Sequence, residues 1–420
     1  MLEFRIKLKK IIKLFEYLEN SQYEPLINHS FSVGNIFFRL IKELKLDYEP
    51  WQVYFTGLFH DINLLMMTTM NDYERTLEFL DSEPDIKKIV FELDGRNKHS
   101  FLGSVFLKNL QFPECFQKMM VYHHTPIDKV TEKDKKLLKA INALQAADEI
   151  SREVLKGGFF SSYKAIERAL ENTRANAEIL PEVEAAVKKL PKSVILKMSM
   201  EADFREIYFN LDSSIQLVKG IAFLLDAKSP YTRNHTTIVS KISSRIGLEM
   251  LTEADSKILE LTGLLHDMGK FNTPLAILHK KGPLDEDEWE IMKNHVVDTY
   301  RILTDSGFGR IAAIAASHHE RLDGTGYPDG LAMSDLDMYS RILQVSDIYS
   351  ALIEERPYRQ KLCPEKALEI IQDTAREDKL DCRVFRELKK LVETDHPSTH
   401  TTYYDTFEDF LGIKYEKVKH

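Results

Sequence analysis

Hydrophobic residues recur at intervals of three and four along almost the whole chain. Residues 36–44, 137–144 and 258–265 are clear examples, and this spacing places their apolar side chains on one face of a helix. The alternating pattern of half-buried strands is nearly absent, and most glycines and prolines stand between the helical stretches. We therefore predict an all-α protein built from helical bundles.

The histidines form two sets that follow the same order along the chain. The first set is His29, His60-Asp61, His99, His123-His124 and Asp148, and the second is His235, His266-Asp267, His295, His318-His319 and Asp347. The first two histidines of each set are 31 residues apart, and the second stands in a Thr-Gly-Leu-x-His-Asp motif both times. An internal repeat of this kind predicts two domains of one type.

The chain length of 420 residues fits two to three domains. We predict an amino-terminal domain over 1–190, a linker and leading helix over 191–230, a second domain over 210–385 and a tail over 386–420. A helical pair is expected over 161–189 and one long helix over 201–228, ended by Ser229-Pro230. Residues 1–20 have the spacing of an amphipathic helix packed on its own domain.

Composition excludes several classes of protein. The net charge of −9 argues against a general DNA-binding surface, and no apolar run reaches the length of a membrane span. The three cysteines, Cys115, Cys363 and Cys382, show no paired spacing, which is typical of reduced thiols in the cytoplasm. A homodimer is the default expectation for a soluble protein of this kind.

The second set of histidines has the chemistry of a metal centre. Asp267 ends an apolar helix and Asp347 stands within another, and a carboxylate is costly to bury unless a cation compensates it. Five imidazoles and two carboxylates are too many ligands for one tetrahedral zinc ion. They suit two first-row transition metals, iron or manganese rather than magnesium. Asp267 is the candidate bridge between them.

Residues 210–385 resemble an HD-GYP domain, a subgroup of the HD phosphohydrolase superfamily. The resemblance rests on Tyr-Thr-Arg-Asn-His (231–235), His-Asp-Met-Gly-Lys (266–270), Glu-Trp-Glu-Ile-Met-Lys-Asn-His (288–295), His-His-Glu-x-x-Asp-Gly-x-Gly-Tyr-Pro (318–328), Asp347 and Arg-Pro-Tyr-Arg (356–359). The family hydrolyses cyclic dinucleotides, chiefly cyclic di-GMP, a second messenger, to the linear dinucleotide pGpG, to GMP or to both.

The resemblance also implies roles for single residues. The metal ligands are His235, His266, Asp267, His295, His318, His319 and Asp347. Lys270 holds the scissile phosphate and acts with Asp267 in catalysis, whereas Tyr327, Arg356 and Arg359 contact the dinucleotide. Family members with a third metal carry a glutamate at the position of Tyr231, so we predict two metal ions.

The first domain resembles a plain, degenerate HD domain. It keeps a counterpart for every metal ligand, but Leu64 stands where the lysine is expected, and Thr125-Pro126 follows the histidine pair in place of the Gly-Tyr-Pro loop. We therefore expect a regulatory or dimerising domain without dinucleotide hydrolysis, whose ability to hold metal stays open.

Three alternatives remain at this point. The tandem arrangement also resembles that of enzymes specific for 3′,3′-cyclic GMP-AMP. A general HD nucleotidase would not need the Gly326-Tyr327-Pro328 loop or the paired arginines. A sensor that binds a cyclic dinucleotide without cleaving it is the alternative from another class, although degenerate members usually lose ligands or the lysine, and this chain keeps both.

Overall fold

The computed structural model describes residues 5–17, 24–61, 100, 103–104, 107–108, 110–157, 162–175, 179–191, 208–227, 235–354 and 360–395. The chain divides into two compact units. The amino-terminal unit is Gln22–Arg205, and the carboxy-terminal unit combines Met1–Ser21 with Glu206–His420. Apart from one two-stranded sheet, the described elements are helical, which confirms the predicted all-α class.

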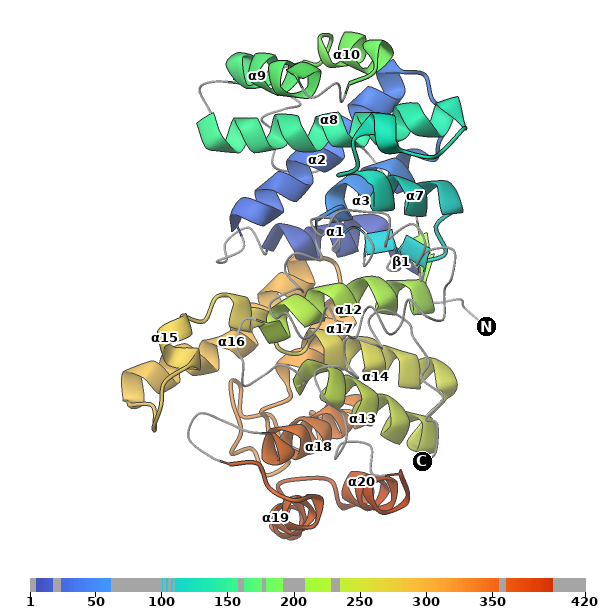
Figure 1. Ribbon diagram of the computed structural model, residues 1–420. Coiled ribbons are helices and arrows are strands. Elements are labelled where there is room, and N and C mark those ends of the chain that lie inside the picture. The colour runs from blue at the N-terminus through green and yellow to red at the C-terminus, as the bar shows by residue number, and fades with distance from the viewer. Residues whose placement is uncertain are drawn as a thin grey trace. The chain divides into compact units, whose positions relative to one another are not determined.

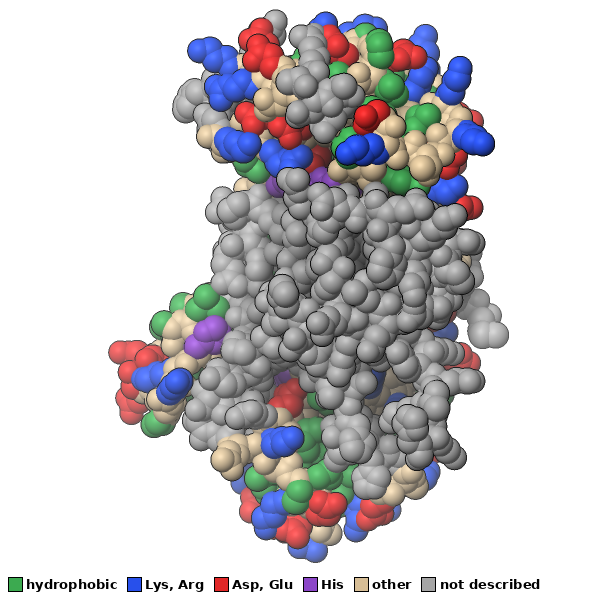
Figure 2. Space-filling view, in the orientation of Figure 1, with side chains coloured by type: hydrophobic (Ala, Val, Ile, Leu, Met, Phe, Trp, Pro, Cys, Tyr) green, Lys and Arg blue, Asp and Glu red, His purple; other side chains and the backbone are tan. Residues whose placement is uncertain are grey.

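In the amino-terminal unit the helices pack around α2 and the long α8. Its elements are α2 (Glu24–Glu43), α3 (Pro50–Phe59), α7 (Glu114–Tyr122), η4 (Ile127–Lys129), α8 (Lys135–Gly157), α9 (Ser162–Ala175) and α10 (Pro181–Val187). Helix α2 packs on α3 and α8, and α8 also packs on α9 (Figure 1). Helices α9 and α10 are the predicted helical pair. Acidic and basic side chains are interspersed over this pair on the face shown in Figure 2.

The carboxy-terminal unit is a second bundle, centred on α13, α14 and α18. Its elements are β1 (Arg5–Lys7), α1 (Leu8–Glu16), β2 (Tyr208–Asn210), α12 (Leu211–Ala227), α13 (His235–Met250), α14 (Glu253–Leu265), η6 (Met268–Phe271), α15 (Leu275–Leu278), α16 (Glu286–Asp305), α17 (Gly309–Ala316), α18 (Met338–Ile353), α19 (Pro364–Arg376) and α20 (Cys382–Asp395). Helix α13 packs on α14 and α18, and α16 packs on α17 and η6. Helix α15 and the start of α16 project from the bundle (Figure 1).

Side-chain caps fix where the helices of this bundle begin. Thr252 and Asp255 form a reciprocal capping box at the start of α14, and Asp285 and Glu288 form another at the start of α16. Each box satisfies backbone N–H groups that the first helical turn leaves without a partner. No helix among the described residues has the length and apolar character needed to cross a membrane.

In the structure the first residues of the chain pack in the carboxy-terminal unit. Strand β1 pairs antiparallel with β2, and α1 packs on α12. The ammonium groups of Lys10 and Lys13 donate hydrogen bonds to the carbonyls of Gly307 and Asp305, at 2.5 and 2.8 Å, at the end of α16. These contacts tie the segment to the carboxy-terminal unit, whereas the sequence pattern had assigned it to the domain over 1–190.

Two other predicted boundaries change. The long helix expected over 201–228 begins only at Leu211, because β2 takes residues 208–210 and the Asn210 side chain accepts the N–H of Ser213, as a helix N-cap does. The tail expected from residue 386 begins too early, because α20 runs to Asp395 and packs on α13 and α18. The rest of the predicted tail, 396–420, lies outside the described residues.

Close helix packing depends on the glycine of the repeated Thr-Gly-Leu motif. A Cβ atom on Gly263 would lie 2.6 Å from Cα of Ser240 on α13, and one on Gly57 would lie 2.9 Å from Cα of Gly34 on α2. Any larger residue would force the two helices apart. The motif therefore sets how near the following His-Asp pair comes to the neighbouring helix.

We expect Gly263→Ala to lower the free energy of unfolding by about 1–3 kcal/mol, because overpacking at a helix contact moves the backbone. Gly309→Ala is the matched control, since a Cβ atom there meets nothing within 4 Å. Denaturant unfolding monitored by circular dichroism checks both variants. Equal unfolding midpoints for Gly263→Ala and wild type would contradict the role given to this glycine.

Candidate metal centre

Seven side chains from five helical segments of the carboxy-terminal unit meet at one buried point. They are His235 at the start of α13, His266 and Asp267 just beyond α14, His295 within α16, His318 and His319 just beyond α17, and Asp347 within α18. In two groups the ligand atoms lie within 4.8 Å of one another. One group is His235, His266 and Asp267, and the other is His295, His318 and His319. Two groups of this kind offer two cation positions.

The carboxylate of Asp267 faces both groups. Its Oδ2 atom lies 3.5 Å from Nε2 of His235 and 3.2 Å from Nε2 of His266. Its Oδ1 atom lies 3.4 Å from Nε2 of His295 and 3.9 Å from Nε2 of His318. One oxygen is therefore directed to each group, which is the geometry a bridging ligand needs. Its role as the bridge between two ions stays a prediction.

Asp347 completes the set, since its carboxylate contacts a histidine of each group. Its Oδ1 atom lies 3.1 Å from Nε2 of His235, and its Oδ2 atom lies 3.8 Å from Nδ1 of His319. It stands within α18, where Ile342, Leu343 and Val345 are fully buried. A charged side chain in such surroundings needs a cationic partner, and the histidine cluster is where that partner would be held.

Backbone carbonyls orient three of the imidazoles. The Nδ1–H group of His266 donates to the carbonyl of Gly263 at 2.7 Å, and His295 and His318 donate in the same way to Met292 and Ala315, both at 2.6 Å. In each case the acceptor lies three residues earlier on the same helix. With the proton held on Nδ1, the Nε2 lone pair points into the centre and is available to a metal ion.

The electrostatics of the centre favour bound cations. Burial lowers the pKa of His295 to about 4 and that of His318 to about 3, so both rings are neutral, as metal ligands must be. Burial alone would raise the pKa of Asp267, but His266 and Lys270 hold it well below its usual value. The Nε2 atom of His266 and the Oδ1 atom of Asp267 are buried without a hydrogen-bond partner. These atoms fit divalent metal ions.

Lys270 lies beside the central carboxylate. The ammonium group is 2.5 Å from Oδ2 of Asp267, and its side chain is 16% exposed. It stands on η6, which packs against α16 so closely that a Cβ atom on Gly269 would lie 1.9 Å from the carbonyl oxygen of His295. Glycine at this position therefore lets the lysine, the carboxylate and His295 come together.

Glu320 holds the Gly-Tyr-Pro loop in place. It is fully buried, and its two carboxylate oxygens accept the backbone N–H groups of Asp329 at 2.8 Å and Leu331 at 3.0 Å. A Cβ atom on Gly326 would lie 2.3 Å from Cα of Glu320. The loop can therefore fold back onto the residue that follows the histidine pair only because residue 326 is glycine.

Tyr327 continues the centre toward solvent. Its ring stacks on His319, with centroids 4.8 Å apart, and its other neighbour is Trp289 of α16, whose ring meets it edge to face at 6.0 Å. Burial raises the pKa of the Tyr327 hydroxyl, so this group stays protonated and can donate a hydrogen bond. Trp289 is 45% exposed, and an aromatic surface is thus open beside the metal ligands.

Sequence reasoning missed the residues that hold His235 and the histidine pair. The Nδ1 atom of His235 lies 3.0 Å from Oγ of Ser350 and 3.1 Å from Oε2 of Glu354. The side-chain amide of Gln344 donates to the carbonyl of Ser317, just before the histidine pair, at 3.2 Å. All three stand on α18 or at its end, within seven residues of Asp347.

The repeat carried a signal for two of them. Gln145 and Ser151 stand at the same offsets from Asp148 as Gln344 and Ser350 from Asp347. Aligning the two sets around their last aspartate, and not only at the histidines, would have singled them out. Glu354 has no such signal, because the matching position in the first set is Leu155.

Several predicted residues lie outside the described part of the chain. They are Tyr231, Arg356 and Arg359 in the carboxy-terminal unit, and Leu64 and His99 in the amino-terminal unit. The substrate contacts assigned to the two arginines therefore stay predictions. The other members of the first histidine set do come together in the amino-terminal unit, as two groups that share Asp61.

We expect Asp267→Asn to lower the number of metal ions bound per chain by two relative to wild type, because both groups share this carboxylate. His235→Gln, which changes one group only, should lower the number by one. Elemental analysis after reconstitution with Mn²⁺ and gel filtration gives both counts. Equal losses in the two variants would contradict a bridging role for Asp267.

Two protein families match the chain. The family model described as HD domain matches residues 221–384, and the one described as HDOD domain matches residues 3–126. The first range holds all seven residues of the candidate centre. The second covers the start of the chain and most of the first histidine set.

The most similar relatives include proteins named for cyclic dinucleotides. The chain is 28% identical over 384 residues to 3′3′-cGAMP-specific phosphodiesterase 1 of Vibrio cholerae, and the alignment covers 86% of each protein. It is 33% identical over 190 residues to a cyclic di-GMP phosphodiesterase of Thermotoga maritima, covering 44% of this chain and 51% of that protein. It is also 39% identical over 178 residues to 3′3′-cGAMP-specific phosphodiesterase 3 of Vibrio cholerae, covering 42% of this chain and 38% of that one.

A solved structure with a similar fold comes from Vibrio cholerae. The crystal structure of a cyclic GMP-AMP specific phosphodiesterase of Vibrio cholerae, V-cGAP3, superimposes with a TM-score of 0.53 at 21% identity. The match covers 93% of this chain and 99% of that one. The similarity at this identity supports the helical architecture of both units and nothing finer.

Proposed function

We propose that this chain, an HD domain protein through residues 221–384, is a metal-dependent phosphodiesterase that hydrolyses the 3′–5′ bonds of cyclic dinucleotides. The observation that carries the proposal is the Asp267 carboxylate, which directs one oxygen to each of two histidine groups and has Lys270 beside it. The relatives named as cyclic dinucleotide phosphodiesterases support the substrate class. The Gly-Tyr-Pro loop beside the centre supports assignment to the HD-GYP subgroup.

Each part of the centre would have its own role in the reaction. The seven predicted ligands would hold two divalent ions, iron or manganese, which when bound lower the pKa of water and polarise a phosphoryl oxygen. Lys270 places a positive charge beside the centre, where it stabilises negative charge that grows on a phosphate held there. Tyr327 offers a hydroxyl donor, and its ring shields His319 on the solvent side.

Cyclic di-GMP, cleaved to pGpG, to GMP or to both, is the substrate we propose first. Relatives named for cyclic di-GMP match part of the chain, as the Thermotoga maritima protein does over 190 residues. A 3′,3′-cyclic GMP-AMP-specific enzyme is the second candidate, because the relative that covers 86% of this chain carries that name. A non-catalytic sensor is a weaker candidate, since the described centre retains Lys270 and all seven predicted ligands.

The cysteines and the proposed substrate suggest a cellular location for the protein. Among the described residues the three cysteines form no disulfide, which accords with the cytoplasm, where cyclic dinucleotides act as signals. We propose this location, a cyclic dinucleotide as the principal partner, and a homodimer as the default assembly.

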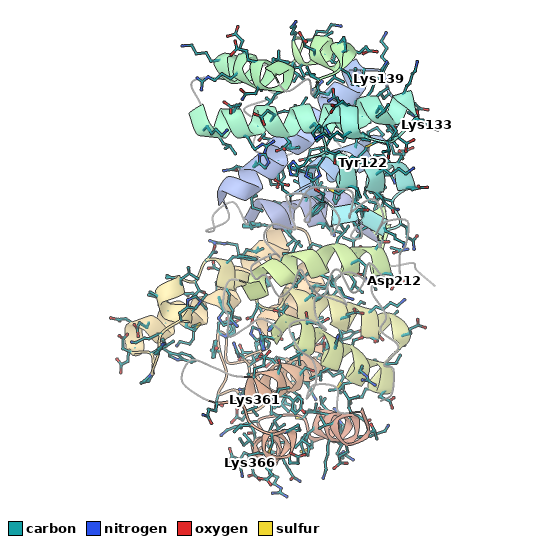
Figure 3. The ribbon with its side chains drawn as sticks, viewed as in Figure 1. Tyr122, Lys133, Lys139, Asp212, Lys361 and Lys366 are labelled. Carbon is teal, nitrogen blue, oxygen red and sulfur yellow. The ribbon has the colours of Figure 1, made fainter. Side chains whose placement is uncertain are left out.

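Purified protein reconstituted with Fe²⁺ or Mn²⁺ under reducing conditions should hydrolyse cyclic di-GMP or 3′,3′-cyclic GMP-AMP, with products followed by chromatography. Lys270→Ala should lower kcat about 10²–10³-fold, as the loss of one charge-stabilising donor does, and His266→Ala should abolish turnover. Lys366→Ala is the matched control, since this lysine is exposed on α19 (Figure 3). Binding of both dinucleotides without turnover of either would replace the enzyme by the sensor.

Trp289 should stack on one base of the bound dinucleotide, because its exposed ring stands next to Tyr327. Base stacking contributes about 1–3 kcal/mol per base, so Trp289→Ala should weaken substrate binding about 5- to 150-fold, whereas Trp289→Phe should keep most of the affinity. Tryptophan fluorescence should be quenched when the dinucleotide binds. The chain has one other tryptophan, Trp51, so the quenching should persist in Trp51→Phe. Quenching that survives Trp289→Phe would contradict this assignment.

A further inference from the structure

The amino-terminal unit contains a second buried cluster of potential metal ligands. Its described members are His29 on α2, His60 and Asp61 just beyond α3, His123 and His124 just beyond α7, and Asp148 on α8. Their ligand atoms form a group of His29, His60, Asp61 and Asp148 and a group of Asp61, His123 and His124, each within 4.8 Å. Among the described residues, these two groups and the two in the carboxy-terminal unit are those that could hold a metal ion.

Asp61 directs one oxygen to each group. Its Oδ2 atom lies 3.4 Å from Nε2 of His60 and 3.7 Å from Nε2 of His29. Its Oδ1 atom lies 3.4 Å from Nε2 of His123 and 3.8 Å from Nε2 of His124. The two oxygens thus divide between the groups in the same way as those of Asp267.

The imidazoles are also oriented for ligation. The Nδ1–H groups of His60 and His123 donate to backbone carbonyls three residues earlier, at 2.8 and 2.6 Å, which leaves both Nε2 atoms directed at Asp61. The side-chain amide of Gln145 donates to the carbonyl of Tyr122 at 2.9 Å, just before the histidine pair. Tyr122 is labelled in Figure 3 at the end of α7.

Arg152 distinguishes this cluster from the one in the carboxy-terminal unit. Its guanidinium group lies 2.8 Å from Oδ2 of Asp148, whereas Oδ1 of Asp148 faces Nε2 of His29 at 3.2 Å and Nε2 of His60 at 3.6 Å. Both oxygens are buried without a hydrogen-bond partner, and Oδ2 also lies 3.7 Å from Nδ1 of His124. The ion pair with Arg152 therefore holds the carboxylate with Oδ1 turned toward His29 and His60. Ala351 stands at the matching position of the other set.

We propose that the amino-terminal unit is itself a metal-binding domain, which holds two divalent transition-metal ions bridged by Asp61, with Arg152 as a positioning residue for Asp148. This goes beyond the proposed phosphodiesterase, which uses the carboxy-terminal centre alone. The loss of the lysine and of the Gly-Tyr-Pro loop removes groups that act on substrate. It removes none of the groups that hold a cation.

The test counts metal ions in the full chain. After chelation and reconstitution with Mn²⁺, the double variant His266→Gln/Asp267→Asn should retain two ions per chain by elemental analysis, whereas wild type should hold four. The double variant His60→Gln/Asp61→Asn should also hold two, and the variant that combines all four substitutions should hold none. A wild-type count of two, or no loss of ions in His60→Gln/Asp61→Asn, would overturn the proposal.

Arg152 is tested by affinity in the His266→Gln/Asp267→Asn background. Arg152→Ala should weaken Mn²⁺ binding about 10- to 100-fold in calorimetry, as the loss of a carboxylate's orienting partner does, and Arg152→Lys should restore part of it. An unchanged affinity in Arg152→Ala would overturn the positioning role.

Thermal unfolding distinguishes variants that lose metal binding from variants that fail to fold. Mn²⁺ should raise the melting temperature of the His266→Gln/Asp267→Asn chain, because a ligand of the folded state stabilises it, and this shift should vanish when Asp61→Asn is added. A cooperative unfolding transition that Mn²⁺ leaves unchanged in the first variant would show a metal-free histidine–aspartate network and overturn the proposal. Hydrolysis of cyclic dinucleotides is not used in any of these measurements, so they fail or succeed independently of the proposed function.

Discussion

The buried carboxylate of Asp267 is the constraint on which the carboxy-terminal unit depends. Its side chain is 2% exposed and lies beside His295 and His318, whose imidazoles burial keeps neutral. Lys270 supplies a positive charge beside this carboxylate. Removing a charge from water is costly unless an opposite charge compensates it. The histidine groups around Asp267 are where cations that compensate its charge would bind. Glycine at position 269 lets η6 approach α16 at this point, because a Cβ atom there would lie 1.9 Å from the carbonyl oxygen of His295.

Much of this arrangement could be predicted from the sequence, because metal ligation constrains both the type of residue and its spacing. The spacing of hydrophobic residues predicted the all-α class. Histidine and aspartate are uncommon in apolar helices, and their ordered recurrence predicted the two related domains and the seven residues that the structure brings together. Residues that orient the ligands or the loop give a weaker signal in the sequence. Glu354 holds His235 and Glu320 holds the Gly-Tyr-Pro loop, but an isolated glutamate has many ordinary roles on a helix surface.

The boundaries were harder to predict because they depend on long-range contacts. The three residues of β1 form a strand only by pairing with β2, some two hundred positions later, and local periodicity cannot report a partner so distant. The helical spacing of α1 was visible in the sequence. Its packing surface was not, because any apolar groove of suitable width would accept an amphipathic helix.

The segment formed by β1 and α1 changes how the chain is connected. Since Met1–Ser21 belongs with Glu206–His420, the amino-terminal unit is an insertion into the fold of its neighbour, joined to it by two chain crossings. A truncation that starts after residue 190 would not release an intact carboxy-terminal unit. Strand β2 would lose its pairing partner. The carbonyls of Asp305 and Gly307, at the end of the helix that carries His295, would lose the hydrogen bonds from Lys13 and Lys10. The division of labour between the two halves is therefore best dissected by point substitution in the whole chain.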